Sequence, residues 1–214
     1  MPRLRQVPRA EAPPEVLDMY DRLFPGRDPV EEPGTATGTP GNWWTVFAIV
    51  PDIFNHAVAG FGLFSSKSRK LNPKFRELGL TRSGFVKGSQ FVFSQHSKAS
   101  RAAGLSDEQV AALPAWQTSD AFSPAERAVL AYTDEVMLAD GRVQDATFDA
   151  LREHLSEEEV LELTYAVASY GLHATICRAL RLEYDDVDER VVEIPVPDGG
   201  GVADVMRDIS RSSD

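Results

Sequence analysis

The chain has 214 residues, of which 43% are hydrophobic and 26% charged, and its formal net charge is −11. This length and composition predict one soluble globular domain with a packed core, with room for a small second one. Nucleic acid is excluded as an expected partner, because phosphate binding needs a concentrated basic face and only residues 67–74 gather Lys and Arg. The acidic surface also repels anions at long range, so a carboxylate ligand would need local cations.

The sequence carries no sign of a membrane or secretory destination. No stretch approaches the roughly twenty apolar residues that span a bilayer, and the basic N-terminus lacks the apolar segment of a secretory signal. The single cysteine, Cys177, cannot form an intrachain disulfide. We therefore expect a cytoplasmic protein with no membrane partner.

Residues 1–41 are predicted to form an N-terminal arm. The first 14 residues are rich in Pro and Arg and are expected to lie along the surface or against a neighbouring subunit. Residues 15–24 have the period of a short amphipathic helix. The Gly-, Pro- and Thr-rich stretch 25–41 is typical of a loop.

Residues 42–184 show helical patterns throughout and are expected to form one all-α domain. Asn42 is a candidate N-cap, and Pro51 separates two helices. Three Ser-x-x-Glu/Gln patterns predict capping boxes, at Ser106, Ser123 and Ser156. After the first helix from residue 42, the expected helices cover residues 51–66, 73–88, 89–104, a short segment from 106, 123–139, 145–154 and 156–182.

The segment 72–113 predicts a helical hairpin that turns at Lys87 and Gly88. Glu77 lies on its first helix and His96 on its second. At a rise of 1.5 Å per residue, their positions relative to the turn leave an axial mismatch of roughly 4–5 Å, which two side chains can bridge. A Glu–His pair in a mostly apolar hairpin is a candidate site for proton transfer.

At these residues the chain resembles the carboxymuconolactone decarboxylase family, whose fold is shared with the alkylhydroperoxidase AhpD. Thiol-bearing members pair a glutamate with C-x-x-C-x-x-x-H and a short turn of the Ala-Gly-Leu-Ser type. Glu77, His96 and residues 103–106 fall on the matching positions, and the resemblance extends from Trp43 to about Glu183. It implies an AhpD-like helical domain built around the central hairpin, catalytic roles for His96 and Glu77, and homo-oligomers, either trimers or hexamers.

The two cysteine positions of that motif are filled here by Ser89 and Val92. A dithiol that cycles through a disulfide needs two thiols within bonding distance. Peroxide reduction of the AhpD type is therefore not expected. Decarboxylase-type members often carry a polar or acidic residue at the position of Val92, so this valine is also a departure from the pattern of the carboxymuconolactone reaction.

Each candidate also has a purely structural explanation. His96 shares a stripe with apolar residues, which is typical of a core histidine as well as of a catalytic one. Glu77 could equally pair with a nearby Arg or Lys. Ser89 is a candidate helix cap and a candidate substrate contact, Val92 a wall of the pocket, and Gln95 a hydrogen-bond donor to a ligand or an exposed polar residue.

The other notable side chains carry weaker signals. The aromatic run from Trp43 to Phe61 favours core packing, with Trp44 assigned to a pocket for a ring substrate. His56 and His173 occur singly, without the spacing of a metal-ligand set, so we predict no metal and no cofactor. Cys177 is interpreted as a buried small apolar residue. Three tyrosines are equal candidates for polar contacts, namely Tyr132, Tyr165 and Tyr170.

The sequence thus predicts a cofactor-independent enzyme that acts on a small cyclic or carboxylated compound. His96 would be the general acid and base, and Glu77 its partner. Decarboxylation, lactone hydrolysis and lactone isomerisation all use these groups together with stabilisation of an oxyanion. Two alternatives stay open: an alkylhydroperoxidase-like member that has lost its dithiol, and a non-catalytic oligomeric protein that binds a ligand.

Residues 185–214 are predicted to form a flexible C-terminal extension. Within it, residues 191–196 either pair as an edge strand, lie across another subunit, or are disordered.

Overall fold

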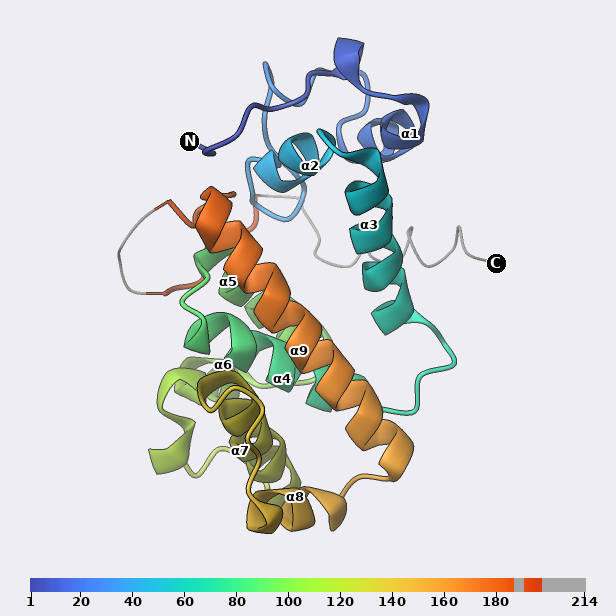
Figure 1. Ribbon diagram of the computed structural model, residues 1–214. Helices are drawn as coiled ribbons and strands as arrows, with labels where there is room; N and C mark the ends of the chain where they lie inside the picture. Colours follow the sequence, from blue (N-terminus) through green and yellow to red (C-terminus); the bar gives the residue numbers. More distant parts are fainter. Residues whose placement is uncertain (187–190, 198–214) are drawn as a thin grey trace. The chain divides into compact units, whose positions relative to one another are not determined.

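The computed structural model describes residues 1–186 and 191–197, and every regular element in these ranges is helical, which confirms the all-α prediction (Figure 1). This part of the chain forms two compact units. One comprises Met1–Lys67 with residues 177–186 and 194–197; the other comprises Ser68–Ile176 with residues 191–193. The division at residues 41/42 and 184/185 that we derive from the sequence stays a prediction, and most of the C-terminal extension lies outside the described residues.

The first unit contains the N-terminal arm and four short helical elements. These are η1 (Arg9–Glu11), α1 (Pro14–Leu23), α2 (Asn42–Phe47) and α3 (Pro51–Ser65). The N-terminal arm packs against the helices of the first unit. The N–H of Val7 donates to the carbonyl of Thr45 at 2.9 Å, and the Val7 side chain is buried. Arg9 donates to Asp28 and to the carbonyl of Phe24.

The aromatic run forms the core of this unit. Trp43 is buried and stacks on Phe47 with ring centroids 4.1 Å apart, and it also contacts Phe54 and Phe61. Trp44 packs edge-on against Trp43 and is half-buried. Core packing accounts for the run, and the assignment of Trp44 to a substrate pocket stays a prediction.

The prediction that Asn42 caps the helix α2 is wrong. The N-cap is Gly41, which has a left-handed φ of 94° and no room for a Cβ, because such an atom would lie 2.7 Å from the Phe24 ring. The capping acceptor is Glu183, whose carboxylate accepts from the N–H groups of Gly41 at 2.9 Å and Trp43 at 2.6 Å. An acceptor so distant in sequence leaves no local signal for a capping rule to detect.

This buried carboxylate predicts a pH-dependent stability. Burial raises the pKa of Glu183 to about 7 from an ordinary 4.5, although the two N–H groups oppose the shift. The folded chain therefore binds this proton more tightly than the unfolded chain, and the free energy of unfolding should fall as pH rises from about 4.5 to about 7. The loss is on the order of a few kcal/mol. Urea titrations across this range should show that the Glu183→Gln variant lacks this slope; equal slopes in both proteins would contradict the assignment.

The second unit carries the predicted hairpin. Its elements are α4 (Pro73–Val86), α5 (Gln90–Ala102), α6 (Asp107–Ala112), η2 (Leu113–Thr118), α7 (Pro124–Leu138), α8 (Asp145–Arg152) and α9 (Glu157–Leu180), of which the residues up to Ile176 belong to this unit. All three predicted capping boxes are confirmed. The 3-10 helix η2 is an element that the sequence patterns do not predict.

The hairpin turns where the sequence predicts. Lys87 is the C-cap of α4, Gly88 has a φ of 64°, and Ser89 caps α5 by accepting from the N–H of Val92. The two helices approach closely at Gly84, where a Cβ would lie 2.7 Å from the backbone nitrogen of Phe93. This glycine therefore sets the separation of the two helices that carry Glu77 and His96.

Replacing Gly84 with alanine should force the hairpin helices apart. We expect a loss of about 1–3 kcal/mol in the free energy of unfolding, the usual cost of overpacking. Gly60 is the matched control, because it is also within a helix but a Cβ there meets nothing within 4 Å. Gly60→Ala should stabilise the protein by up to about 1 kcal/mol through helix propensity. Urea unfolding measures both; a Gly84→Ala protein as stable as the wild type would show that the helices can yield.

A buried ion pair ties the hairpin to the rest of its unit. The guanidinium of Arg82 on α4 donates to both carboxylate oxygens of Asp134 on α7, at 2.6 and 3.0 Å. Arg82 also donates to the carbonyl of Leu113, and Asp134 also accepts from the indole N–H of Trp116. Both charged side chains are buried. One pair thus joins α4, α7 and η2.

Residues 191–197 form no strand and lie as an irregular segment. In the second unit, the side-chain amide of Gln90 donates to the carbonyl of Val192 and accepts from its N–H. The carboxylate of Glu193 accepts two hydrogen bonds from Arg101, each 2.8 Å long. The described end of the chain is therefore attached along α5 by its backbone at one point and by an ion pair at another.

Candidate functional site

Glu77 and His96 are in direct contact. An oxygen of Glu77 (Oε2) lies 2.7 Å from Nδ1 of His96, so the hairpin closes the axial mismatch that its sequence implies. The other oxygen (Oε1) accepts from Nε of Arg76 at 3.0 Å and lies 2.9 Å from its Nη2. The predicted Glu–His pairing and the alternative of an ion pair with arginine are thus both present, on different oxygens of one carboxylate.

The surroundings of Glu77 keep it ionised. Glu77 is buried, and burial by itself would raise its pKa, but the facing His96 and Arg76 outweigh that effect and hold the pKa of Glu77 below its ordinary value. The carboxylate is therefore negatively charged at neutral pH. An ionised carboxylate can only accept hydrogen bonds.

This charge determines the tautomer of the histidine. Because Glu77 can only accept a hydrogen bond, Nδ1 of His96 must carry a hydrogen. In the neutral ring the basic lone pair is therefore on Nε2. Nε2 is then the atom that takes up or delivers a proton. The carboxylate also holds the ring in one orientation, as the acid of a catalytic triad does.

Helix α9 supplies a row of rings next to the pair. Tyr170 meets His96 edge-on with ring centroids 4.5 Å apart, and His173 follows at 5.6 Å from Tyr170. Burial, and to a lesser extent the charge of His96, lowers the pKa of His173 to about 3, so this second histidine stays neutral at physiological pH. Of the two, only His96 is placed against an ionised carboxylate.

The remaining predicted site residues are placed as follows. Ser89 is buried, and its hydroxyl oxygen is engaged as the cap of α5. Val92 is also buried, and Gln95 is half-buried one position before His96. Trp44 belongs to the first unit. The contacts of these four side chains with a substrate stay predictions.

Sequence reasoning missed the parts contributed by α9 and the double role of Glu77. Tyr170 is one of three tyrosines that the sequence leaves equal, and nothing in the local pattern marks it out. The spacing Tyr-x-x-His at 170 and 173 places both rings on one face of a helix, and it is the signal that could have found them.

Cys177 is buried in the first unit, and burial raises the pKa of its thiol well above the ordinary value. A buried neutral thiol is a poor nucleophile. Among residues 1–186 and 191–197, no three His, Cys, Asp or Glu side chains gather as a metal site would require. No helix in the same ranges is long and apolar enough to cross a membrane.

The region around the pair is similar to known proteins. Residues 53–135, which include Glu77 and His96, match the model of the carboxymuconolactone decarboxylase family. The uncharacterized protein YdfG of Bacillus subtilis (strain 168) is 29% identical over 103 residues, which cover 48% of this chain and 70% of that protein.

Solved structures of similar fold include the following two. One is an uncharacterized peroxidase-related protein with an alkylhydroperoxidase AhpD core from Ralstonia eutropha JMP134, with a TM-score of 0.68 and 19% identity over 86% of this chain and 93% of that one. The other is a variant of the debrominase Bmp8 in complex with 2,3,4-tribromopyrrole, with a TM-score of 0.62 and 17% identity over 94% of this chain and 92% of that one.

The molecule is thus an all-α protein of AhpD-like fold whose central hairpin holds a buried Glu–His pair. The region that carries the pair, residues 53–135, is similar to the carboxymuconolactone decarboxylase family, as the resemblance in the sequence indicates.

Proposed function

We propose that the protein is a cofactor-independent enzyme in which His96 moves a proton to or from a small cyclic or carboxylated compound. The observation that carries this proposal is the 2.7 Å contact between Glu77 and Nδ1 of His96. A buried, ionised carboxylate that fixes the tautomer of a histidine is the usual arrangement of a general acid and base.

For a decarboxylation the steps follow from this arrangement. The carbon–carbon bond to the substrate carboxylate breaks, CO2 departs, and the electron pair passes into a conjugated carbonyl as an enolate. Nε2–H of the His96 imidazolium then protonates the substrate carbon. The neutral imidazole recovers its proton from water, so the overall reaction consumes one proton and releases one CO2. Hydrolysis or isomerisation of a lactone would use the same nitrogen.

The substrate class rests on two supporting points. The walls near the pair are apolar or aromatic, as Val92 and Tyr170 show, which suits a planar ring. Bmp8, a protein of the same fold, has been solved with a halogenated pyrrole. Ser89 and Gln95 are proposed as further substrate contacts.

Thiol-based peroxide reduction is the less favoured alternative. The two positions that would carry thiols hold Ser89, whose oxygen caps α5, and the buried Val92. The thiol of Cys177 has a raised pKa. A catalytic cycle between a dithiol and a disulfide needs two cysteines, and this chain has one.

The test is a reaction in D2O with carboxymuconolactone and a panel of carboxylated unsaturated lactones. Mass spectrometry would follow CO2 release and the incorporation of one deuteron at carbon. We expect both products from the wild type and from Cys177→Ser, and their loss from His96→Gln. Reduction of an organic hydroperoxide that disappears in Cys177→Ser would favour the redox alternative instead.

A further inference from the structure

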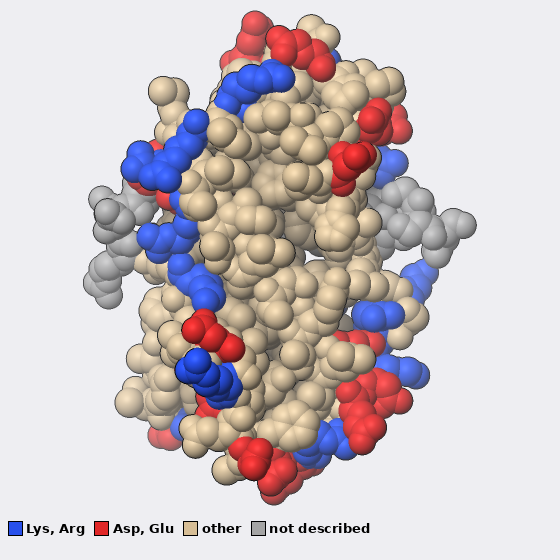
Figure 2. Space-filling view, viewed as in Figure 1, with Lys and Arg blue, Asp and Glu red and all other residues tan. Residues whose placement is uncertain are grey.

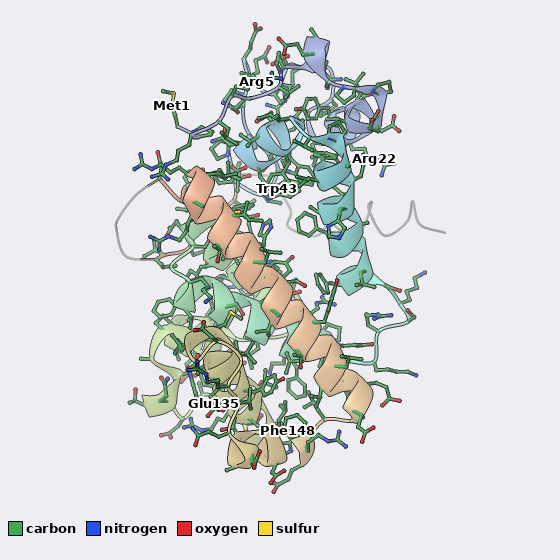
Figure 3. All side chains as sticks on the ribbon, in the orientation of Figure 1. Met1, Arg5, Arg22, Trp43, Glu135 and Phe148 are labelled. Carbon is green, nitrogen blue, oxygen red and sulfur yellow. The ribbon has the colours of Figure 1, made fainter. Side chains whose placement is uncertain are left out.

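Four rings from two helices form a row that begins at the Glu77–His96 pair. His96 meets Tyr170 edge-on, with ring centroids 4.5 Å apart, and Tyr170 lies 5.6 Å from His173. His173 in turn lies 5.9 Å from Phe91. The first and last rings belong to α5 and the middle two to α9, which Figure 3 shows crossing the hairpin with side chains between the ribbons. The row therefore starts and ends on the helix that carries His96.

The two histidines of this row have different surroundings. His96 faces the ionised carboxylate of Glu77, whereas His173 lies between the aromatic rings of Tyr170 and Phe91. Burial, and then the charge of His96, lowers the pKa of His173 to about 3. The two imidazoles are thus close enough to interact electrostatically. Titratable groups that one site places in different environments can take different parts in acid–base chemistry.

The middle of α9 carries no charged side chain. Residues 163–176 contain no Asp, Glu, Lys or Arg, and Figure 2 shows tan surface over the middle of the helix, with charged atoms towards its ends. Lys87 approaches α9 at Gly171, but its ammonium group donates to the carbonyl of Met137. A negative charge that develops on a ligand beside the row therefore depends on His96 and on neutral hydrogen-bond donors. Such donors act strongly where water is excluded.

We infer that His173 is a second catalytic residue, a neutral hydrogen-bond donor that stabilises the oxyanion of a planar ring while His96 moves the proton. This inference rests on the proposed function and narrows its substrate class. The ring must carry an oxygen that is conjugated with the reacting carbon, as in an enone, an unsaturated lactone or a phenol. The flat faces of Tyr170 and Phe91 suit such a ring.

The neutral state of His173 suits this role better than a charged one. A neutral imidazole has one N–H to donate and keeps its proton. An imidazolium at the same place would protonate the enolate oxygen and withdraw the electron pair that the carbon needs. When the carbon–carbon bond breaks and the electron pair passes to the oxygen, the N–H of His173 donates to that oxygen. Nε2–H of the His96 imidazolium then protonates the carbon. Neutral histidines polarise carbonyl oxygens in this way in known isomerases.

The probe for the test is para-nitrophenol, a planar ring whose ionised form absorbs visible light. On binding, its O–H proton passes to Nε2 of His96, and its oxygen accepts from the N–H of His173. The full chain is titrated at a pH at which the free phenol is mostly neutral. In the wild type, the absorbance of the phenolate should rise with protein concentration. Equilibrium dialysis measures the total bound phenol in parallel.

Three variants isolate the N–H group. His173→Phe keeps an aromatic ring without a donor, and it should bind the phenolate about 10–100-fold more weakly, the usual loss for one hydrogen bond to a charged group. The ionised share of the bound phenol should fall as well, which a change of packing alone would not cause. His173→Gln returns a donor and should recover part of the binding. His56→Phe is the matched control, because it makes the same substitution at an exposed histidine of α3, and it should behave as the wild type.

The outcomes separate this inference from the proposed function. If the wild type and His173→Phe turn over a lactone equally in D2O, the inference is overturned and the proposed function stands. If phenolate binding depends on His173 but no lactone releases CO2, the oxyanion site stands and decarboxylation falls. A wild type that leaves the phenol neutral, or a His173→Phe protein that ionises it fully, would also overturn the inference. Circular dichroism confirms that each variant is folded.

Discussion

Replacing Asp134 with alanine is expected to lower the free energy of unfolding by about 3–5 kcal/mol, the range seen when one partner of a buried ion pair is removed. The carboxylate accepts both hydrogen bonds of the Arg82 fork and a third from the indole of Trp116. Its loss leaves a buried guanidinium without a counter-charge where α4, α7 and η2 meet. A shift of the urea midpoint with an unchanged slope measures the effect.

The matched control is an exposed ion pair in the same chain. Glu11 pairs with Arg5 at 3.0 Å, and both side chains are well exposed. Glu11→Ala should cost less than about 1 kcal/mol, because water screens such a pair. If Asp134→Ala cost no more than Glu11→Ala, the buried network would not stabilise the unit as described.

Replacing His96 with glutamine is expected to reduce turnover of the proposed lactone substrate by about 10²–10⁴-fold, the usual contribution of a general acid or base. Glutamine keeps a polar group near Glu77 but cannot exchange a proton near neutral pH. Steady-state kinetics on the compound that reacts in D2O measures the loss. The effect should fall on kcat, since the proton moves only in the reacting complex.

Glu77→Gln should approach the same loss by changing the tautomer of the ring. Arg76 donates to one oxygen of Glu77 and would hold the amide oxygen of the glutamine there. The amide NH2 would then face Nδ1 of His96, which must become an acceptor, and the ring hydrogen would move to Nε2. A loss of up to about 10⁴-fold is known for a wrong tautomer of this kind. Activity that survives in Glu77→Gln but not in His96→Gln would limit Glu77 to a structural role.

Much of the fold follows from local rules in the sequence. The three capping boxes, the turn at Gly88 and the cap at Ser89 each depend on side chains within a few residues of the backbone that they satisfy. The same is true of the Glu77–His96 contact, because a hairpin with a short turn fixes which positions face each other. These features were predictable because their partners are near in sequence.

The features that escaped prediction join distant parts of the chain. The cap of α2 comes from Glu183, and the network of Arg82 reaches η2 and α7. Tyr170 reaches His96 from a helix that starts more than fifty residues after α5 ends. The two partners of each contact are too far apart in the sequence to fall within one local pattern. Rules based on spacing and helix propensity therefore cannot predict these contacts.

The attachment of Val192 to Gln90 has a consequence for how much the end of the chain can vary. The amide of Gln90 occupies the N–H and the carbonyl of Val192, as a neighbouring peptide group would, and it makes no use of the valine side chain, which is 52% exposed. Almost any residue can therefore stand at position 192, with proline excluded because it has no N–H. Position 90 is restricted, because only the side-chain amide of glutamine offers both the donor and the acceptor at this distance from the helix. Substitutions should therefore be tolerated at position 192, and they should be restricted at position 90 on α5.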